Sequence, residues 1–210
     1  MKQYDSFKKQ YSAKGFMLQW LLLPFYLFTF LLFPSCTADP MYGSPYACSF
    51  IFYTSYHPTS ALTLALGNPG SYVTVSPQVR QGVMHLVMTT NGGENEDLTL
   101  TTEKEAKRLD YSNMGANRRL IIGCSNASGL KAYDGHCSNC LREFGGLNYP
   151  LTWIENGRKL KCAKCARVYN PDADGLVVEN GQDGDRNLYQ YAIVLNSEFL
   201  HVYNGKPQGF

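Results

Sequence analysis

Two pairs of cysteines in this chain have the spacing needed to bind a metal. The first pair is Cys137 and Cys140 in "CSNC", and the second is Cys162 and Cys165 in "CAKC". A Cys-x-x-Cys turn directs two sulfur atoms to one place, so two such turns can complete the closed tetrahedron of thiolates of a structural zinc site. Soft thiolates also bind iron, as a single ion or in a [2Fe–2S] cluster. The sequence therefore predicts one metal site at these residues and leaves zinc, iron and a cluster open.

Two other uses of the cysteines stay open from the sequence. Exported proteins meet oxidising conditions, under which each pair can close as a disulfide. A Cys-x-x-Cys pair can also act as a redox dithiol, although no thioredoxin-type βαβ pattern surrounds these pairs. Cys48 and Cys124 stand apart from the motifs, and Cys124 lies in the apolar run "LIIGCS", where a cysteine usually packs as a small hydrophobic residue. A Cys48–Cys124 bridge also stays open.

The elements that position the four cysteines are predicted to be strands. Residues 151–162, "LTWIENGRKLKC", form two strand-like runs around Asn156–Gly157, a residue pair favoured in type I′ hairpin turns. Cys162 ends the second of these runs. Cys137 follows the strand-like run "LKAYDGHC", which places the first motif in the loop after a strand. We therefore expect both motifs to lie on β-turns.

The rest of the chain from Cys48 onward also has the period-two pattern of strands. We expect two strands around a Gly/Pro turn in residues 60–76, further strands in 82–90 and 118–125, and a closing hairpin that turns near Asn196–Ser197. Residues 91–97, "NGGENED", are predicted to be a solvated loop, and residues 101–113 a short surface helix or loop. The predicted fold is an antiparallel β-sandwich or barrel with a small metal subdomain over about 133–170.

The N-terminal region has the organisation of an export signal. Residues 1–15 are polar and basic, and Phe16–Phe33 then runs for 18 residues without a charge. The boundary "LLFPSC" resembles a bacterial lipoprotein box, which predicts a signal peptide at 1–35, lipidation of Cys36, a tether at 36–46 and one β domain at 47–210. An uncleaved membrane anchor is the alternative. Both place the domain outside the cytoplasm on a membrane, at the periplasmic side or the cell surface.

The segment Arg119–Asn204 resembles the Rieske iron–sulfur family, in particular the Rieske-like lipoproteins of Bacteroidetes-type bacteria. The likeness rests on "KAYDGHCSNC", "LKCAKCARVYNPDADG", "NGQDGDRNLYQYAIVL" and "FLHVYN". The resemblance implies an all-β fold with a small rubredoxin- or zinc-ribbon-like subdomain. It also implies two ligand loops, each after a strand, and a covering loop before the final hairpin.

The ligands of this chain depart from that family's pattern. The family offers Cys-x-His in one loop and Cys-x-x-His in the other; Cys137 and Cys162 match the two cysteines, while the histidine positions fall on Asn139 and Cys165. Cys140 lies one residue beyond the first histidine position. The resemblance therefore implies a four-cysteine site, and histidine ligands, which raise the reduction potential of a [2Fe–2S] centre, are absent from it.

No other constellation indicates chemistry. The chain has no Gly-x-Ser-x-Gly, no phosphate-cradling glycine loop and no Ser/His/Asp set, so we expect no enzymatic activity. His136 is expected to be solvated or to support the site rather than to ligate. The remaining histidines and the aspartates of "NPDADG" and "GQDGD" are expected at structural, surface or turn positions.

The charge balance of the chain bears on which partners we expect. From Cys36 onward, 15 Lys and Arg face 16 Asp and Glu without a basic stripe, which gives no indication of nucleic acid. We expect a membrane-tethered metal-binding lipoprotein with a structural or binding role. The alternative is an extracytoplasmic electron-transfer protein that carries a [2Fe–2S] cluster and meets a redox or surface partner.

Overall fold

The computed structural model of the chain describes residues 43–204. The predicted signal peptide, the Cys36 lipidation site and most of the predicted tether lie outside these residues. All described residues belong to one compact unit. Within them, no helix combines the length and the apolar character needed to cross a membrane.

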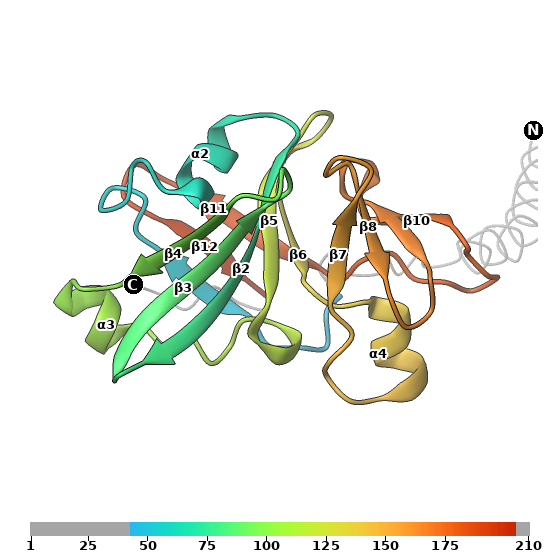
Figure 1. Cartoon of the computed structure of the whole chain (residues 1–210), viewed down its shortest axis with the longest axis horizontal. Coiled ribbons are helices and arrows are strands. Elements are labelled where there is room, and N and C mark those ends of the chain that lie inside the picture. Colours follow the sequence, from blue (N-terminus) through green and yellow to red (C-terminus); the bar gives the residue numbers. More distant parts are fainter. Residues whose placement is uncertain (1–42, 205–210) are drawn as a thin grey trace, which may run out of the picture. The chain divides into compact units, whose positions relative to one another are not determined.

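The larger of two sheets has eight strands in the order β1-β12-β11-β6-β5-β2-β3-β4 and curls around the main core (Figure 1). Each neighbouring pair is antiparallel, which confirms the predicted antiparallel β architecture. Apolar side chains at alternate positions of these strands fill the inside of the curl, including Phe50, Leu86, Ile122 and Val202. The strands are β1 (Ser49–Phe52), β2 (Ser71–Arg80), β3 (Val83–Thr90), β4 (Asn95–Thr99), β5 (Leu120–Ser125), β6 (Gly129–Asp134), β11 (Gln190–Leu195) and β12 (Leu200–Tyr203).

The smaller sheet has four strands in the order β10-β9-β8-β7. They are β7 (Leu151–Ile154), β8 (Lys159–Cys162), β9 (Val168–Asn170) and β10 (Leu176–Glu179), with the short 3-10 helix η2 (Pro171–Ala173) between β9 and β10. In the sequence this sheet and helix α4 (Ser138–Phe144) lie between β6 and β11, which are hydrogen-bonded neighbours in the larger sheet. The two Cys-x-x-Cys motifs therefore belong to an insertion between two paired strands of the main sheet.

Helix α2 (Ala61–Gly67) corrects the prediction of a strand before the Gly/Pro turn. Leu62, Leu64 and Leu66 alternate in the sequence, but the buried residues are Leu62, Ala65 and Leu66, at helical spacing, and Leu64 is 52% exposed. Ser60 caps the helix because its side chain accepts a hydrogen bond from the Thr63 backbone N–H. The apolar residues of 61–67 fit the period of a strand as well as that of a helix. The Ser60 cap and the packing on the sheet favour the helix.

Two polar segments gave one correct and one wrong prediction. The segment predicted as a short helix or loop contains α3 (Glu103–Arg108), whose N-cap Thr102 accepts from the Glu105 backbone N–H and donates its hydroxyl to the Glu105 carboxylate. The predicted solvated loop at 91–97 instead contains the start of β4, which pairs with β3 at the edge of the sheet. The sequence did not predict this strand, because Asn95–Asp97 are polar and neither face of β4 is buried there, so no apolar alternation is present.

The β7–β8 hairpin is confirmed, but its turn begins one residue earlier than predicted. The Gly157 N–H donates to the Ile154 carbonyl at 3.1 Å, so Glu155 and Asn156 are the central residues, both with positive φ. Gly157 meets the main sheet directly, because a Cβ there would lie 2.1 Å from the Asn91 carbonyl oxygen. This close approach requires glycine and fixes the hairpin against the end of β3.

Asp172 joins the two sheets at a second place. Its carboxylate accepts hydrogen bonds from the Tyr72 hydroxyl at 2.9 Å and the Asn126 side-chain amide at 2.7 Å, both in the main sheet or its loops. Burial by itself raises the pKa of Asp172, but these hydrogen bonds outweigh burial and hold the pKa below its ordinary value of 3.8.

We therefore expect Asp172→Asn to lower the free energy of unfolding by about 1–3 kcal/mol at pH 7, because an amide would face the Asn126 donor. The contribution of the lowered pKa is present above about pH 4 and is lost as the pH falls through the folded-state pKa, so the difference between variant and parent should shrink in acid. Denaturant unfolding at neutral and acidic pH measures both effects. Asp174→Asn is the matched control, because Asp174 is 62% exposed and pairs only with Lys131. Equal losses in the two variants would contradict the assigned role.

Candidate metal centre

The four predicted cysteines come together at one point. The ligand atoms of Cys137, Cys140, Cys162 and Cys165 all lie within 4.8 Å of one another. Two contacts are short: Cys137 Sγ to Cys165 Sγ at 3.6 Å and Cys140 Sγ to Cys162 Sγ at 3.7 Å. Both join one motif to the other, at distances far above the S–S bond length of about 2.05 Å, so no disulfide is formed here.

The first motif opens a helix, where a turn in a loop was expected. Cys137 is the N-cap of α4, and its sulfur accepts a hydrogen bond from the Cys140 backbone N–H at 3.5 Å. A sulfur atom thus takes the place of the oxygen that Ser, Thr or Asp usually supplies at an N-cap. The first turn of α4 then carries Cys140 to the same side as Cys137.

The second motif is a tight turn at the end of β8. The Ala166 N–H donates to the Cys162 carbonyl at 2.9 Å, and the Cys162 N–H donates to the Arg167 carbonyl at 3.0 Å. Ala166 has φ of 61°, a left-handed conformation that is uncommon for a residue with a Cβ and that reverses the chain into β9. The turn leaves Cys162 fully buried and Cys165 partly exposed.

Tyr169 and Asn139 support the sulfur atoms from within the core. The Asn139 side-chain amide donates to the Tyr169 hydroxyl oxygen at 3.0 Å, and that hydroxyl lies 3.1 Å from Cys137 Sγ. Because the amide occupies the hydroxyl oxygen as a donor, the phenolic proton is available for the sulfur. Asn139, which lies between Cys137 and Cys140, is therefore a fully buried support and not a ligand.

The thiols influence one another's ionisation. The hydrogen bond from Cys137 lowers the pKa of Cys162 to about 5, with further help from the backbone N–H groups of Cys165 and Lys164. The same bond raises the pKa of Cys137, and burial raises the pKa of Cys140 to about 12. The thiolate of Cys162 thus forms readily, whereas Cys137 and Cys140 need a cation to ionise beside it.

Arg167 lies beside this cluster and is nearly completely buried, with 3% exposure. Its guanidinium makes a bidentate pair with Asp185, in which Nε lies 2.8 Å from Oδ2 and Nη2 lies 2.8 Å from Oδ1. Glu143 on α4 takes a second pair of bonds at 2.9 and 3.3 Å, and the guanidinium also bonds to the Cys165 sulfur. Arg167 therefore connects both motifs to the segment 180–188 before β11.

Backbone contacts hold that segment in place as well. The Arg186 N–H donates to Asn139 Oδ1 and the Arg186 carbonyl accepts from Asn139 Nδ2, both at 2.9 Å. Arg142 donates to the Gly184 carbonyl at 2.9 Å. The segment thus lies against α4, the helix that begins at the cysteines. The resemblance implied a covering loop at this place, but no local pattern indicated these partners, since Asp185 lies 18 residues from Arg167 and Arg186 lies 47 from Asn139.

The described histidines are not part of the cysteine group. His136 is buried, not solvated, and its backbone N–H donates to the buried Asp134 carboxylate at 2.9 Å. His57 pairs with Glu105 at 2.9 Å and His85 with Asp97 at 2.8 Å, while His201 is buried and burial lowers its pKa.

Cys48 and Cys124 are not bridged. Cys48 Sγ contacts the Val202 carbonyl oxygen at 3.6 Å, and Cys124 Sγ contacts the Ser125 carbonyl oxygen at 3.8 Å. Cys48 is fully packed in the core of the larger sheet, whereas Cys124, which was expected to be buried, is only partly covered.

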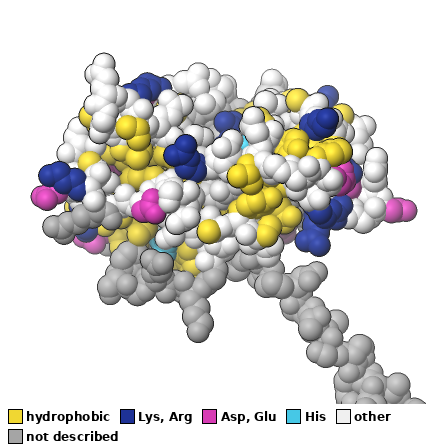
Figure 2. Space-filling view, turned by 90° about the horizontal axis from the view of Figure 1, so that it is seen from below, with side chains coloured by type: hydrophobic (Ala, Val, Ile, Leu, Met, Phe, Trp, Pro, Cys, Tyr) yellow, Lys and Arg dark blue, Asp and Glu magenta, His cyan; other side chains and the backbone are white. Residues whose placement is uncertain are grey.

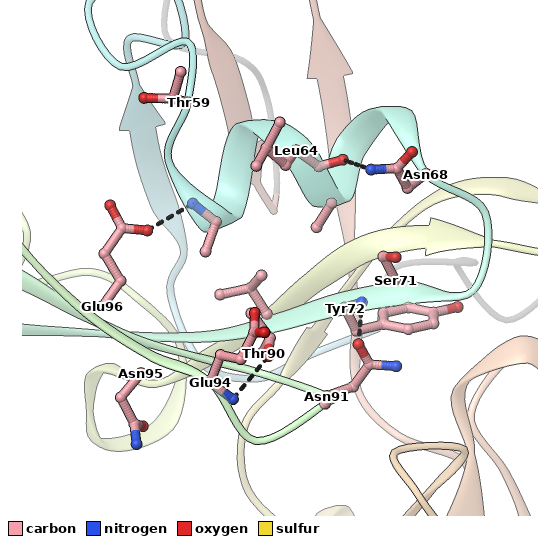
Figure 3. Close-up of a pocket in the computed structure, with 14 residues that line it drawn as sticks. Thr59, Leu64, Asn68, Ser71, Tyr72, Thr90, Asn91, Glu94, Asn95 and Glu96 are labelled. Atoms are coloured by element: carbon pink, nitrogen blue, oxygen red, sulfur yellow. Dashed lines mark hydrogen bonds between the residues drawn. The ribbon is translucent and has the colours of Figure 1, made fainter.

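A separate surface cavity of about 510 Å³ lies between α2 and the strands β2 to β4 (Figure 3). Its polar side chains already serve the fold: Glu96 accepts from the Ala61 N–H at 2.6 Å, and Asn91 accepts from the Tyr72 N–H at 3.2 Å. None of the lining residues is Cys, His, Lys or Arg. We assign no chemistry to this cavity.

Comparison of the chain with models of known protein families, with curated proteins and with solved structures gives no match.

Removing the Arg167 guanidinium should loosen the segment 180–188. We expect Arg167→Gln to lower the free energy of unfolding by about 3 kcal/mol, because the carboxylates of Asp185 and Glu143 would face each other without their cation. Hydrogen exchange of the backbone amides in 180–188 should also become faster. Arg142→Gln is the control, since Arg142 contacts the same segment from an exposed position. Unchanged exchange in Arg167→Gln would contradict the assigned contact.

Proposed function

We propose that this protein holds one structural zinc ion between the four cysteines and that the ion fastens the inserted subdomain to the main sheet. The observation that carries the proposal is the distance among the sulfurs. A tetrahedron with zinc–sulfur bonds of about 2.3 Å has edges of about 3.8 Å. The two short contacts of 3.6 and 3.7 Å are near this value, and no pair exceeds 4.8 Å.

The burial of the site supports a structural role. Three of the four cysteines are fully buried, and all four sulfurs lie within 4.8 Å of one another, so an ion bound by all four would have no position left open for a substrate. Closed four-thiolate sites of this kind are structural, whereas catalytic zinc keeps one position for water or substrate. A [2Fe–2S] cluster fits less well, because its two irons would separate one pair of sulfurs from the other.

The Rieske-like relationship and the membrane tether are also part of the proposal. Three features support the relationship: Cys137 follows β6, Cys162 ends β8, and the segment 180–188 lies against the motifs just before the closing β11–β12 hairpin. The basic, apolar and Cys36-containing N-terminus supports an exported lipoprotein. We infer a tethered domain whose metal maintains its shape, in place of the electron transfer of a histidine-ligated cluster.

Metal content tests the site. We expect about one zinc per chain in protein purified without added metal, with no colour in visible light. Cys140→Ser and Cys165→Ser should each lose the zinc, while Cys124→Ser, which changes a cysteine outside the group, should keep it. A red-brown protein that contains iron and sulfide would instead support the electron-transfer alternative, and zinc retained in Cys140→Ser would remove that residue from the site.

Removal of the ion tests the structural role. Zinc contributes an apparent free energy of about 10–16 kcal/mol in small zinc-folded peptides, comparable to the whole stability of a domain, about 5–15 kcal/mol. We therefore expect a chelator under reducing conditions to lower the unfolding temperature by tens of degrees, and added zinc to restore it. A chelated protein that is free of zinc and unfolds at the same temperature as before would contradict the structural role.

A further inference from the structure

Large apolar side chains are exposed at the end of α4. Phe144 is 56% exposed and Leu147 is 50% exposed, and the Tyr149 ring lies 6.2 Å from the Phe144 ring. The Lys164 ammonium lies 5.2 Å from the centre of the Phe144 ring, and Arg142 precedes Phe144 by two residues. We call these five residues the tip patch. Figure 2, viewed from the side on which α4 lies in Figure 1, shows hydrophobic side chains gathered beside Lys and Arg.

The backbone that carries Phe144 and Leu147 is held in place by a helix end and by Tyr149. Helix α4 ends at Gly145, where φ is 67°, and Gly146 also has positive φ, so the chain turns sharply after Phe144. The Tyr149 hydroxyl then donates to the Gly145 carbonyl at 2.7 Å, and Tyr149 packs on the cluster that contains Leu141 and Tyr189. Phe144 and Leu147 are therefore presented to solvent by a loop that is held at both ends.

The charges around the patch favour an anionic partner. Arg142 and Lys164 are exposed, and the nearby carboxylates of Glu143 and Asp185 both bind the buried Arg167, with Glu143 also 3.7 Å from Arg142. Asp183 is the remaining acid of the adjoining segment. A few apolar side chains with basic residues beside them are typical of protein surfaces that enter the interface of a bilayer.

The start of the described chain lies at the same place. The Tyr46 ring packs on the cluster below Tyr149, with its centre 6.0 Å from the Tyr189 ring. Cys36, the predicted lipidation site, precedes Gly43 by seven residues, which span at most about 25 Å. A chain tethered at Cys36 therefore keeps this side of the domain within reach of the lipid.

We propose that the tip patch contacts the surface of an anionic bilayer, with Phe144 and Leu147 entering the interface and Arg142 and Lys164 facing lipid phosphates. This inference rests on the proposed membrane tether and goes beyond it, because it gives the domain a fixed orientation. A protein partner is the weaker choice, since neither the cavity beside α2 nor a second one near Pro77 includes any patch residue.

The test uses the full chain in vesicles with brominated lipids, which quench nearby tryptophan. Leu147→Trp places the probe in the patch, and Leu64→Trp places it on α2 at nearly equal exposure, 52% against 50%. The signal of Trp153, and that of Trp20 where residues 1–35 are not cleaved, is subtracted with the parent chain. We expect quenching and a blue shift of the Leu147→Trp signal in anionic vesicles only, weakened by salt. Quenching of Leu147→Trp no greater than that of Leu64→Trp would overturn the proposal. A blue shift that depends on protein concentration and not on lipid would also overturn it, because it would indicate that the patch binds a second copy of the chain.

Charge variants complete the test. Arg142→Gln and Lys164→Gln should each reduce the docked population about fivefold, the factor that corresponds to about 1 kcal/mol per basic residue near an anionic surface. Lys107→Gln, an exposed control on α3, should leave it unchanged. Zinc analysis of each variant separates loss of docking from damage to the metal site. Flotation with neutral vesicles reports the tether by itself. A chain that floats with vesicles but shows no quenching at the patch refutes the docking alone. A chain that floats with neither neutral nor anionic vesicles refutes both the tether and the docking.

Discussion

The constraint on which the inserted subdomain depends is the convergence of sulfur atoms from two distant turns. One turn opens α4 directly after a strand of the main sheet, and the other ends β8 of the smaller sheet. Thiolates repel one another, so they remain this close only when thiols share protons or a cation neutralises them. The pKa values of Cys137 and Cys162, displaced in opposite directions by their shared hydrogen bond, express this conflict. A bound cation resolves it and converts repulsion into a cross-link.

Side chains around the site hold the two cysteine turns in their relative positions. Tyr169 and Asn139 occupy the space beside Cys137 with matched donors and acceptors, which avoids unsatisfied polar groups in the core. Arg167 gathers two carboxylates from separate segments and contacts Cys165. The smaller sheet also meets the main sheet at Gly157 and Asp172, away from the sulfurs. The subdomain is thus fastened at several places, of which the cysteine cluster is the one that could hold a metal ion.

The main sheet and the insertion have different roles. The curled sheet supplies most of the apolar core, while the insertion carries the cysteines, the segment 180–188 and the tip patch. Because α4 begins at Cys137 and ends at Phe144, the same short helix joins the buried site to the exposed apolar side chains. Ordering of the cysteines therefore also orders the surface that we assign to the bilayer.

Much of the strand pattern and the complete cysteine group followed from the sequence. Period-two runs identified β3, β5, β6 and the two hairpins, because each run is a local pattern. Each Cys-x-x-Cys pair is local as well, and the presence of two such pairs indicated that they share one site. Segments whose letters fit two structures were decided by tertiary contacts. The leucines of α2 alternate like a strand yet pack as a helix, and Asn95–Asp97 became a strand only because β3 offers an edge.

The supporting residues of the site were determined only by the folded chain. Asn139 lies inside the first cysteine motif without being a predicted ligand, and its burial beside Tyr169 makes it a hydrogen-bond support. Arg167, Glu143 and Asp185 are ordinary charged letters in the sequence, and they become a buried network because three distant segments meet. Sequence spacing determines which side chains a single turn brings together; contacts between segments far apart in the chain depend on how the sheets pack, which no local pattern records.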